Sequence, residues 1–424
     1  MPLWPWACCS IFNWTNSVKY PAVLLLLALH LLVLAVPPKP LEPDEAAYLY
    51  GGRNLLARSA HLNEPELMRQ MAQAREQGFT LGPHPLGYAP LKGTSYTFTK
   101  PIGFPLLVAI TDRLVSYRLL NTVCSLLLIL YLTATLKQHM HTDFWPFILL
   151  LYLNPAVVLM LARPLMSDFV SMAALALLFL SAHCLITRLA AGKTYGMHGV
   201  VYSLAFLLAP FLRLSNLLIM PLLALYLLYR CLRTPIRLLR PFIILSLLLL
   251  ILCGLLISLV NLHMYGHSLW TGYKQLDNPR RSGLPFAFLN ILYPNRVNFS
   301  GIMVRNAVMF LRYLLPAYPV LLILCLSPPT ARRPLYVLAY LVTAWVLLLF
   351  FQYKVPMNIH YIFIMRMFLP MAPFAALLAA PAACKRRWAV PFLLILSLIS
   401  YFAFVYLTRA AACATVAPCL WSVS

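Results

Sequence analysis

Long runs of apolar residues alternate with short polar segments along most of this 424-residue chain. A helix needs about 20 apolar residues to cross a bilayer, and about eleven runs approach that length. We predict a spanning helix in each run: 20–37, 117–136, 145–162, 168–187, 197–213, 215–231, 241–262, 310–327, 334–352, 365–382 and 389–408. The expected fold is therefore an all-α polytopic membrane protein that forms one membrane domain over residues 1–424.

Two longer polar stretches separate these runs. The first covers residues 38–101, and inside it the mixed charges of Glu64–Gly78 predict a helix near the membrane surface. Directly after it, Ile102–Leu114 is apolar but too short to span, so we interpret it as a dipping or interfacial helix. The second stretch, residues 263–300, is rich in Tyr, Asn, Gly and Pro, and it predicts an ordered, partly irregular outer cap.

Composition supports a lipid-embedded chain. Hydrophobic residues make up 62% of the sequence and charged residues only 10%, whereas a soluble domain carries about 25% charged residues. The net charge of +23 suggests a nucleic-acid partner at first. The basic residues, however, lie in short loops between apolar segments, so membrane topology explains them better. The chain also has neither a GxGxxG fingerprint nor a P-loop, and no loop is large enough for a nucleotide-sugar domain.

The basic loops predict the orientation of the chain. Cytoplasmic loops carry an excess of Lys and Arg, and one set of alternate loops contains Lys137, Arg188, Lys193, Arg230, Arg233, Arg237, Arg240, Arg332, Arg333, Lys385, Arg386 and Arg387. That set is assigned to the cytoplasm, which places both long polar stretches outside. All acidic residues except Asp143 then fall on the outward side.

Three of these acids are candidates for chemistry. Asp44 and Glu45 follow the first span almost at once, and Asp168 lies at the outer end of the fourth. Carboxylates so close to hydrocarbon are costly unless they are paired or used. A carboxylate here is able to take the proton of a hydroxyl that attacks a sugar. Alternatively, Asp44 caps a helix that runs from Glu45 toward Leu56, because Asp is a preferred N-cap residue.

Four cations lie at outer helix ends or in outward loops: Lys100, Arg163, Arg213 and Arg366. Lys and Arg stabilise a phosphate leaving group as it gains charge. The alternative for each is a side chain that snorkels to lipid headgroups.

A metal site is not predicted, although a divalent ion is not excluded. His263 and His267 have metal-binding spacing, but Gly266 interrupts the segment and no third ligand is evident. The aromatic run Tyr265–Tyr273 suits either stacking on a sugar ring or an interfacial aromatic belt.

Several of these motifs, in this order, resemble the type C membrane glycosyltransferase superfamily, in particular its protein O-mannosyltransferase and lipid A aminoarabinose transferase branch. The similar segments are Pro43–Tyr48, Thr99–Pro101, Arg163–Asp168, Asn261–Tyr273 and Arg366–Pro370. The family's Lys-Pro-Pro is Lys100-Pro101-Ile102 here, and its Arg-Tyr is Arg366-Met367.

The resemblance implies a polyprenyl-phosphate sugar donor, an inverting single displacement and no cofactor. It also implies roles for individual residues: Asp44 as the catalytic carboxylate with Glu45 in support, Lys100 and Arg366 as ligands of the donor phosphate, and Asp168 as a residue that shapes the site. To these we add Arg163, a cation at an outer helix end, as a third phosphate ligand, and Tyr48 and Tyr273 as further site-shaping residues.

We therefore expect a glycosyltransferase that works on the extracytoplasmic face, with a bacterial inner membrane favoured. Its partners would be the lipid-phosphate donor, membrane lipids and an acceptor glycan, lipid or protein. Two alternatives remain open: a transporter or flippase for a lipid-linked sugar, and a non-catalytic scaffold of a cell-envelope assembly.

Overall fold

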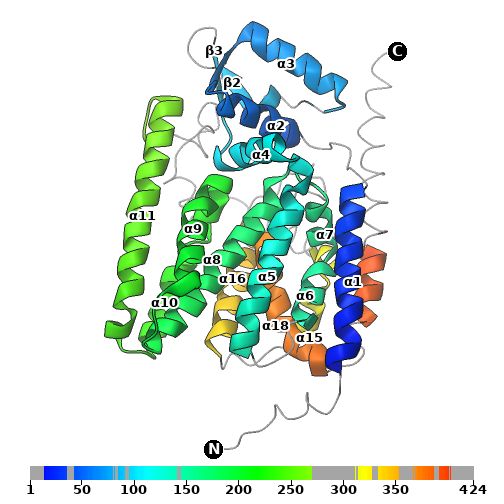
Figure 1. Ribbon diagram of the computed structural model, residues 1–424, viewed down its shortest axis with the longest axis vertical. Coiled ribbons are helices and arrows are strands. Elements are labelled where there is room, and N and C mark those ends of the chain that lie inside the picture. Colours follow the sequence, from blue (N-terminus) through cyan, green and yellow to red (C-terminus); the bar gives the residue numbers. More distant parts are fainter. Residues whose placement is uncertain are drawn as a thin grey trace, which may run out of the picture. The chain divides into compact units, whose positions relative to one another are not determined.

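The structure is a computed structural model. It describes residues 14–35, 43–79, 81, 85–90, 95–140, 145–269, 311, 314–326, 333–352, 366, 368–385, 391–400 and 402, most of them helical (Figure 1). The chain forms two compact units. Unit 1 comprises Met1–Leu32, Ile129–Met160 and Asn295–Ser424, and unit 2 comprises Val33–Leu128 and Leu161–Pro294. Most of the second polar stretch, including Tyr273, lies outside the described residues.

Four helices in the described part of the chain are long and apolar enough to cross a membrane. They are Tyr117–Thr135, Ser167–Ala190, Leu214–Cys231 and Ile236–Tyr265, and shorter apolar helices accompany them at Leu26–Ala35, Gly196–Leu212, Pro334–Leu348, Leu369–Pro381 and Pro391–Ser400. The expected mainly helical membrane protein is therefore found. The expected number of about eleven spans is not confirmed.

Two spans predicted in unit 1 are interrupted. One is 145–162, and the other is 310–327, in which Leu315–Ala317 and Val320–Leu326 form separate helices. The helices of unit 1 are α1 (Trp14–Ala35), α6 (Trp145–Tyr152), α7 (Pro155–Leu161), α14 (Leu315–Ala317), α15 (Val320–Leu326), α16 (Pro334–Gln352) and α18 (Ala372–Lys385). The expected single span 145–162 is broken between α6 and α7. Pro155 has no N–H to continue a helix, and Asn154 Nδ2 donates to the carbonyl of Leu150 at 2.7 Å, which ends α6.

Unit 2 contains the helices around which the candidate site is built. They are α5 (Leu120–Met140, shared with unit 1), α8 (Ser167–Ala190), α9 (Gly196–Leu212), the 3-10 helix η4 (Leu214–Leu218), α10 (Leu222–Cys231) and α11 (Ile236–Tyr265). The most apolar window of α8 is 94% buried, whereas that of α11 is only 11% buried. Helix α8 is thus central in the unit, and α11 presents most of its apolar surface outward. It ends at Gly266, whose φ of +72° suits a glycine.

The first polar stretch contains strands as well as helices, which the all-α prediction did not include. Its elements are α2 (Pro43–Leu56), β1 (His61–Asn63), α3 (Glu64–Glu76), a 3-10 turn (Pro85–Gly87), β2 (Tyr88–Pro90) and β3 (Ser95–Phe98), and α4 (Gly103–Leu114) follows directly after it. The strands form an antiparallel sheet in the order β1-β3-β2. This sheet was not predicted. The helices α3 and α4 do occur at Glu64–Gly78 and Ile102–Leu114, where the charge and hydropathy patterns place them.

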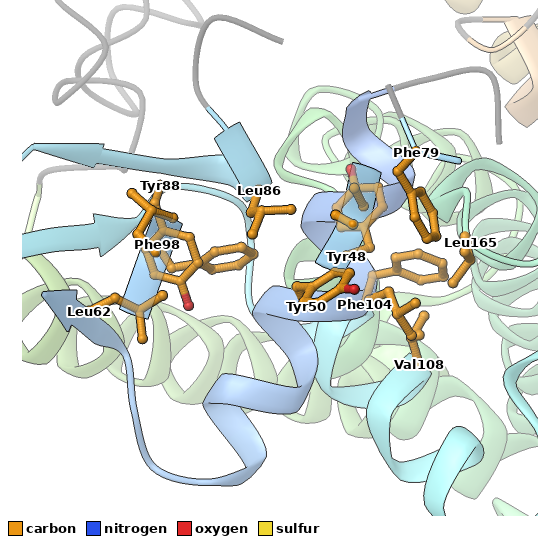
Figure 2. Close-up of a cluster of buried hydrophobic side chains, with 14 of the residues drawn as sticks. Tyr48, Tyr50, Leu62, Phe79, Leu86, Tyr88, Phe98, Phe104, Val108 and Leu165 are labelled. Carbon is orange, nitrogen blue, oxygen red and sulfur yellow. The ribbon is translucent and has the colours of Figure 1, made fainter. Parts of the chain in front are cut away.

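A hydrophobic cluster joins these elements into one body (Figure 2). Tyr48 of α2 contacts Phe104 of α4 edge to face, with ring centroids 4.9 Å apart. Tyr88 and Phe98 meet between adjacent strands at 5.4 Å. Leu165, from the link between α7 and α8, packs into the same cluster. Burial of these side chains stabilises the sheet, whose strands are too short to be stable alone.

Candidate active site

The first turn of α2 places two acids side by side. Pro43 opens this helix, as proline often does at a first helical position, and Asp44 and Glu45 lie in the first turn. Asp44 is thus inside the helix instead of capping it, which corrects the capping alternative. Both carboxylates are near the positive end of the helix dipole, which favours their charge.

Asp44 forms an ion pair with Lys100. Lys100 Nζ lies 2.7 Å from Asp44 Oδ1, and the two side chains retain 19% and 28% of their exposure. Lys100 is held at the end of β3, because Thr99 bonds to the Gly87 carbonyl through both its amide (2.9 Å) and its hydroxyl (2.8 Å). Gly87 itself has a φ of +74°, and a Cβ there would lie 2.9 Å from Ala47 Cβ. The turn therefore needs glycine.

Glu45 forms a second ion pair, and this one is buried. Arg163 Nη2 lies 2.5 Å from Glu45 Oε2, and the two side chains are 1% and 3% exposed. Arg163 belongs to the link between α7 and α8, so this pair fastens α2 to the membrane helices of unit 2. The Nε and Nη1 atoms of Arg163 have no hydrogen-bond partner among the described residues. Glu45 is therefore the main compensation for the Arg163 charge.

Asp168 forms the third pair, with Arg213. The Asp168 side chain is fully buried at the start of α8, and Arg213, between α9 and η4, is 21% exposed. Nearby, Ser171 Oγ donates to Asn216 Oδ1 at 2.9 Å, and Asn216 Nδ2 donates to the Ala209 carbonyl at 2.7 Å. These contacts lock the irregular turn after α9 onto α8.

Two glycines of α2 allow this helix to lie close to β3 and α4. A Cβ at Gly51 would lie 2.1 Å from the Phe98 ring, and one at Gly52 would lie 2.1 Å from the Pro105 carbonyl oxygen. Helix α2 therefore lies directly against α4 and β3. The close backbone approach fixes where Asp44 and Glu45 can sit.

A pocket of unit 2 opens beside Lys100. It has an empty volume of about 460 Å³, counting the part open to solvent, and it is lined by Thr99, Lys100, Pro101, Ile102, Pro210, Phe211, Leu214, Ile257, Val260, Asn261 and Tyr265. Most of this lining is apolar, and the polar groups gather on the Lys100 side and at the end of α11. A ligand with a charged head and an apolar tail fits such a surface.

Asn261 and Tyr265 at the end of α11 line the pocket. The sequence included them in the segments Asn261–Tyr273 and Tyr265–Tyr273 but gave neither residue a role of its own at the donor site. Tyr265 Oη donates to the Phe98 carbonyl at 3.1 Å, and Thr97 Oγ1 donates to the Met264 carbonyl at 3.2 Å. The end of α11 is thus bonded to β3, directly before Lys100.

Three predicted site residues remain to be placed: Tyr48, Arg366 and Tyr273. Tyr48 is 6% exposed and packs in the hydrophobic cluster beneath the acidic turn. Arg366 is 7% exposed and belongs to unit 1, so its role at the donor phosphate stays a prediction. Tyr273 lies outside the described residues. Within the described part of the chain, no three His, Cys, Asp or Glu residues gather as metal ligands.

Tyr88, in the first polar stretch, has a pKa that is shifted by its burial. Burial raises the pKa of Tyr88 to about 12, although a hydrogen bond from Asn54 Nδ2 (3.0 Å) opposes the shift. Asn54 also donates to Gln70 Oε1 at 2.9 Å. This network joins α2, α3 and β2 behind the acidic turn.

The arrangement can hold a carboxylate and an ammonium at the edge of an apolar pocket, with a buried ion pair behind them. No known family model, curated protein or solved structure matches this chain.

Proposed function

We propose that this chain is a membrane glycosyltransferase that moves a sugar from a polyprenyl-phosphate donor to an acceptor outside the cytoplasm. The observation that carries the proposal is the partly exposed Asp44–Lys100 pair beside the apolar pocket. It combines a base for the acceptor with a cation for the phosphate. The membrane-spanning character of the chain explains why the donor would be a lipid.

The chemistry assigns a separate task to each member of the pair. Asp44 takes the proton of the acceptor hydroxyl as the oxygen attacks the anomeric carbon. The bond from that carbon to the phosphate oxygen breaks with inversion. Lys100 stabilises the lipid phosphate as it leaves, and Arg366 is the proposed second cation. The first carbons of the lipid lie against the apolar lining around Phe211 and Ile257.

Arg163 is better suited to positioning than to donor binding. Its side chain is 1% exposed and paired with Glu45, so a phosphate cannot reach it unless the surrounding residues move apart. We therefore assign Arg163 and Glu45 to the support of Asp44. Arg213 and Asp168 hold the neighbouring turn in the same way.

The test is a transfer assay in membranes that supply a lipid-phosphate sugar. Asp44→Asn removes the base while keeping size and burial, and we expect turnover to fall by about 10²–10⁴-fold. The matched control is Glu64→Gln, which removes an exposed acid at the start of α3 and should leave turnover unchanged. Normal turnover of a folded Asp44→Asn protein would rule out the proposal.

The flippase alternative makes a different prediction in the same membranes. A flippase moves the intact lipid-linked sugar across the bilayer and forms no new glycosidic bond. Transbilayer movement of the donor without any glycosylated product would therefore favour the transporter. The described ion pairs lie at helix ends and in the first polar stretch, whereas transporter sites gather near the bilayer midplane.

A further inference from the structure

Unit 2 has a basic end, defined here as Arg188, Lys193, Arg230, Arg233, Arg237 and Arg240. These residues lie where α8 and α10 end and where α9 and α11 begin. Asp168 is at the opposite end of α8, about 30 Å from Arg188 at a rise of about 1.5 Å per residue. No acidic residue occurs between Asp168 and Asp277 in the sequence. The basic end thus has no carboxylate of its own within these helices.

Arg230 is the buried member of this group. It is 7% exposed, and its Nη1 atom donates to Thr187 Oγ1 at 3.2 Å and to Tyr226 Oη at 3.3 Å. Tyr226 Oη is also 2.6 Å from His183 Nδ1. Side chains of α8 and α10 therefore hold the guanidinium in a defined place by neutral hydrogen bonds.

A buried charge without an opposite charge is strongly unfavourable. None of the ion pairs in the described part of the chain involves Arg230. Snorkelling does not explain its position, because a snorkelling side chain extends away from the protein into the interface, and Arg230 is enclosed. Tyr229 adds a second observation, since its buried hydroxyl has no partner among the described residues.

Exposed cations lie near Arg230 at the surface of the basic end. The side chains of Lys193, Arg233, Arg237 and Arg240 are exposed, and the Arg233 guanidinium lies 5.0 Å from the centroid of the Tyr229 ring. A phosphate that approaches this end meets several exposed cations first and a fixed, enclosed one behind them. Basic pockets between membrane helices are typical sites for anionic lipid headgroups.

We infer that the basic end binds the headgroup of an anionic phospholipid, with Arg230 as the central ligand of the phosphate. The inference is independent of the proposed transferase activity, because the site is at the opposite end of α8 from Asp168. The lipid supplies the negative charge that these helices lack. Its acyl chains then lie along the exposed apolar side chains of α10 and α11, such as Leu228 and Ile236.

Lipid binding to the detergent-purified full chain tests this site. We expect native mass spectrometry to show phosphatidylglycerol retained in preference to phosphatidylcholine, and the thermal unfolding midpoint to rise with phosphatidylglycerol. Arg230→Gln should weaken phosphatidylglycerol binding by about tenfold, as expected for the loss of one charge-assisted contact. Arg113→Gln, which removes an exposed cation from α4, is the matched control and should change nothing.

A second variant keeps the test valid if Arg230→Gln does not fold. Arg233→Gln combined with Arg237→Gln changes only exposed side chains, and it should reduce the preference for phosphatidylglycerol and its sensitivity to salt. Equal retention of both lipids by the unaltered protein would overturn the inference. Equal protection by inorganic phosphate alone would show that a free anion is the ligand. Loss of stability in Asp143→Asn equal to that in Arg230→Gln would identify Asp143, which lies outside the described residues, as the partner instead.

Discussion

The ammonium nitrogen of Lys100 lies 2.7 Å from a carboxylate oxygen of Asp44, although 56 positions separate the two residues in the chain. The contact joins the first turn of α2 to the end of β3. Both groups remain partly exposed, so a substrate can reach either one. In the proposed reaction, the donor phosphate competes with Asp44 for Lys100, and binding of the donor thereby releases the base.

We expect the loss of Lys100 to weaken donor binding, whereas the loss of Asp44 lowers turnover. Lys100→Gln removes the phosphate ligand, and we expect the KM for the lipid-phosphate donor to rise by about tenfold, from the loss of one charge-assisted contact. Lys100→Arg should restore part of the affinity. Steady-state transfer assays with varied donor measure both effects, and Arg113→Gln serves as the control. An unchanged donor KM in Lys100→Gln would remove Lys100 from the donor site.

The buried Glu45–Arg163 pair makes a prediction about stability. Glu45→Gln leaves a buried guanidinium without its opposite charge, and the expected cost is about 3–5 kcal/mol. Adding Arg163→Met to Glu45→Gln removes that stranded charge and should recover most of the loss. Thermal unfolding of the purified variants in detergent tests this order. A double variant that is less stable than Glu45→Gln alone would contradict it.

We predict that a side chain added at Gly52 would push α2 away from α4. The Cβ of Gly52→Ala would lie 2.1 Å from the backbone oxygen of Pro105, and backbone cannot give way as a flexible side chain can. We expect a loss of about 1–3 kcal/mol from overpacking, together with reduced transfer activity because the acidic turn moves. Gly254→Ala in α11 is the matched control, because its Cβ meets no atom within 4 Å. The two variants should differ in unfolding midpoint, and equal midpoints would refute the close packing of α2 on α4.

Tyr88 predicts a loss of stability at alkaline pH. The pKa of Tyr88 is raised from 10.0 to about 12 by burial, so the folded state favours the neutral phenol. Its contribution to stability is complete below pH 10 and is lost as the pH rises toward 12. Tyr88→Phe cannot ionise, and its unfolding midpoint should decline less steeply over this range. It should also be lower at neutral pH, because the hydrogen bond from Asn54 is worth about 1 kcal/mol.

Tyr96→Phe, on the neighbouring strand, is the control for Tyr88→Phe. It removes a hydroxyl from a half-buried side chain without touching the Asn54 network. Parallel alkaline profiles for Tyr88→Phe and the unaltered protein would show that Tyr88 does not limit stability there.

Hydropathy predicted where most helices lie, because burial in lipid requires long apolar runs. It missed the break at Asn154. There the Asn154 side chain bonds to a backbone carbonyl of the helix and Pro155 cannot donate a backbone hydrogen bond, although the residues on both sides are apolar. It also missed the sheet, whose strands are only three or four residues long. Strand β1 pairs with β3 across a helix and a turn, and packing against the aromatic cluster, not a local pattern, sets that pairing.

The sequence placed Asp44 and Lys100 at one candidate site, but it did not predict the Glu45–Arg163 or Asp168–Arg213 pair. Glu45 and Arg163 are 118 positions apart, and no periodicity connects them. The sequence assigned Arg163 to the donor because it lies at a helix end, and only its enclosure in the structure suggests a supporting role. Asn261 and Tyr265 belong to segments that the sequence did indicate, but their position beside Lys100 depends on the fold.

The separation of charge along unit 2 has a consequence for how the protein is inserted. All seven acids that the structure describes belong to this unit, in the first polar stretch, in α4 or at the start of α8, where cations such as Arg53, Lys100 and Arg213 accompany them. The six cations of the basic end have no acidic residue among them. A resting membrane holds its interior negative, and moving one elementary charge through 100 mV changes the energy by about 2.3 kcal/mol. In the expected orientation the basic end faces this negative interior, and an inverted molecule would carry its six cations against that voltage. If the basic end faces the cytoplasm as predicted, the membrane voltage therefore continues to favour that orientation after synthesis has ended.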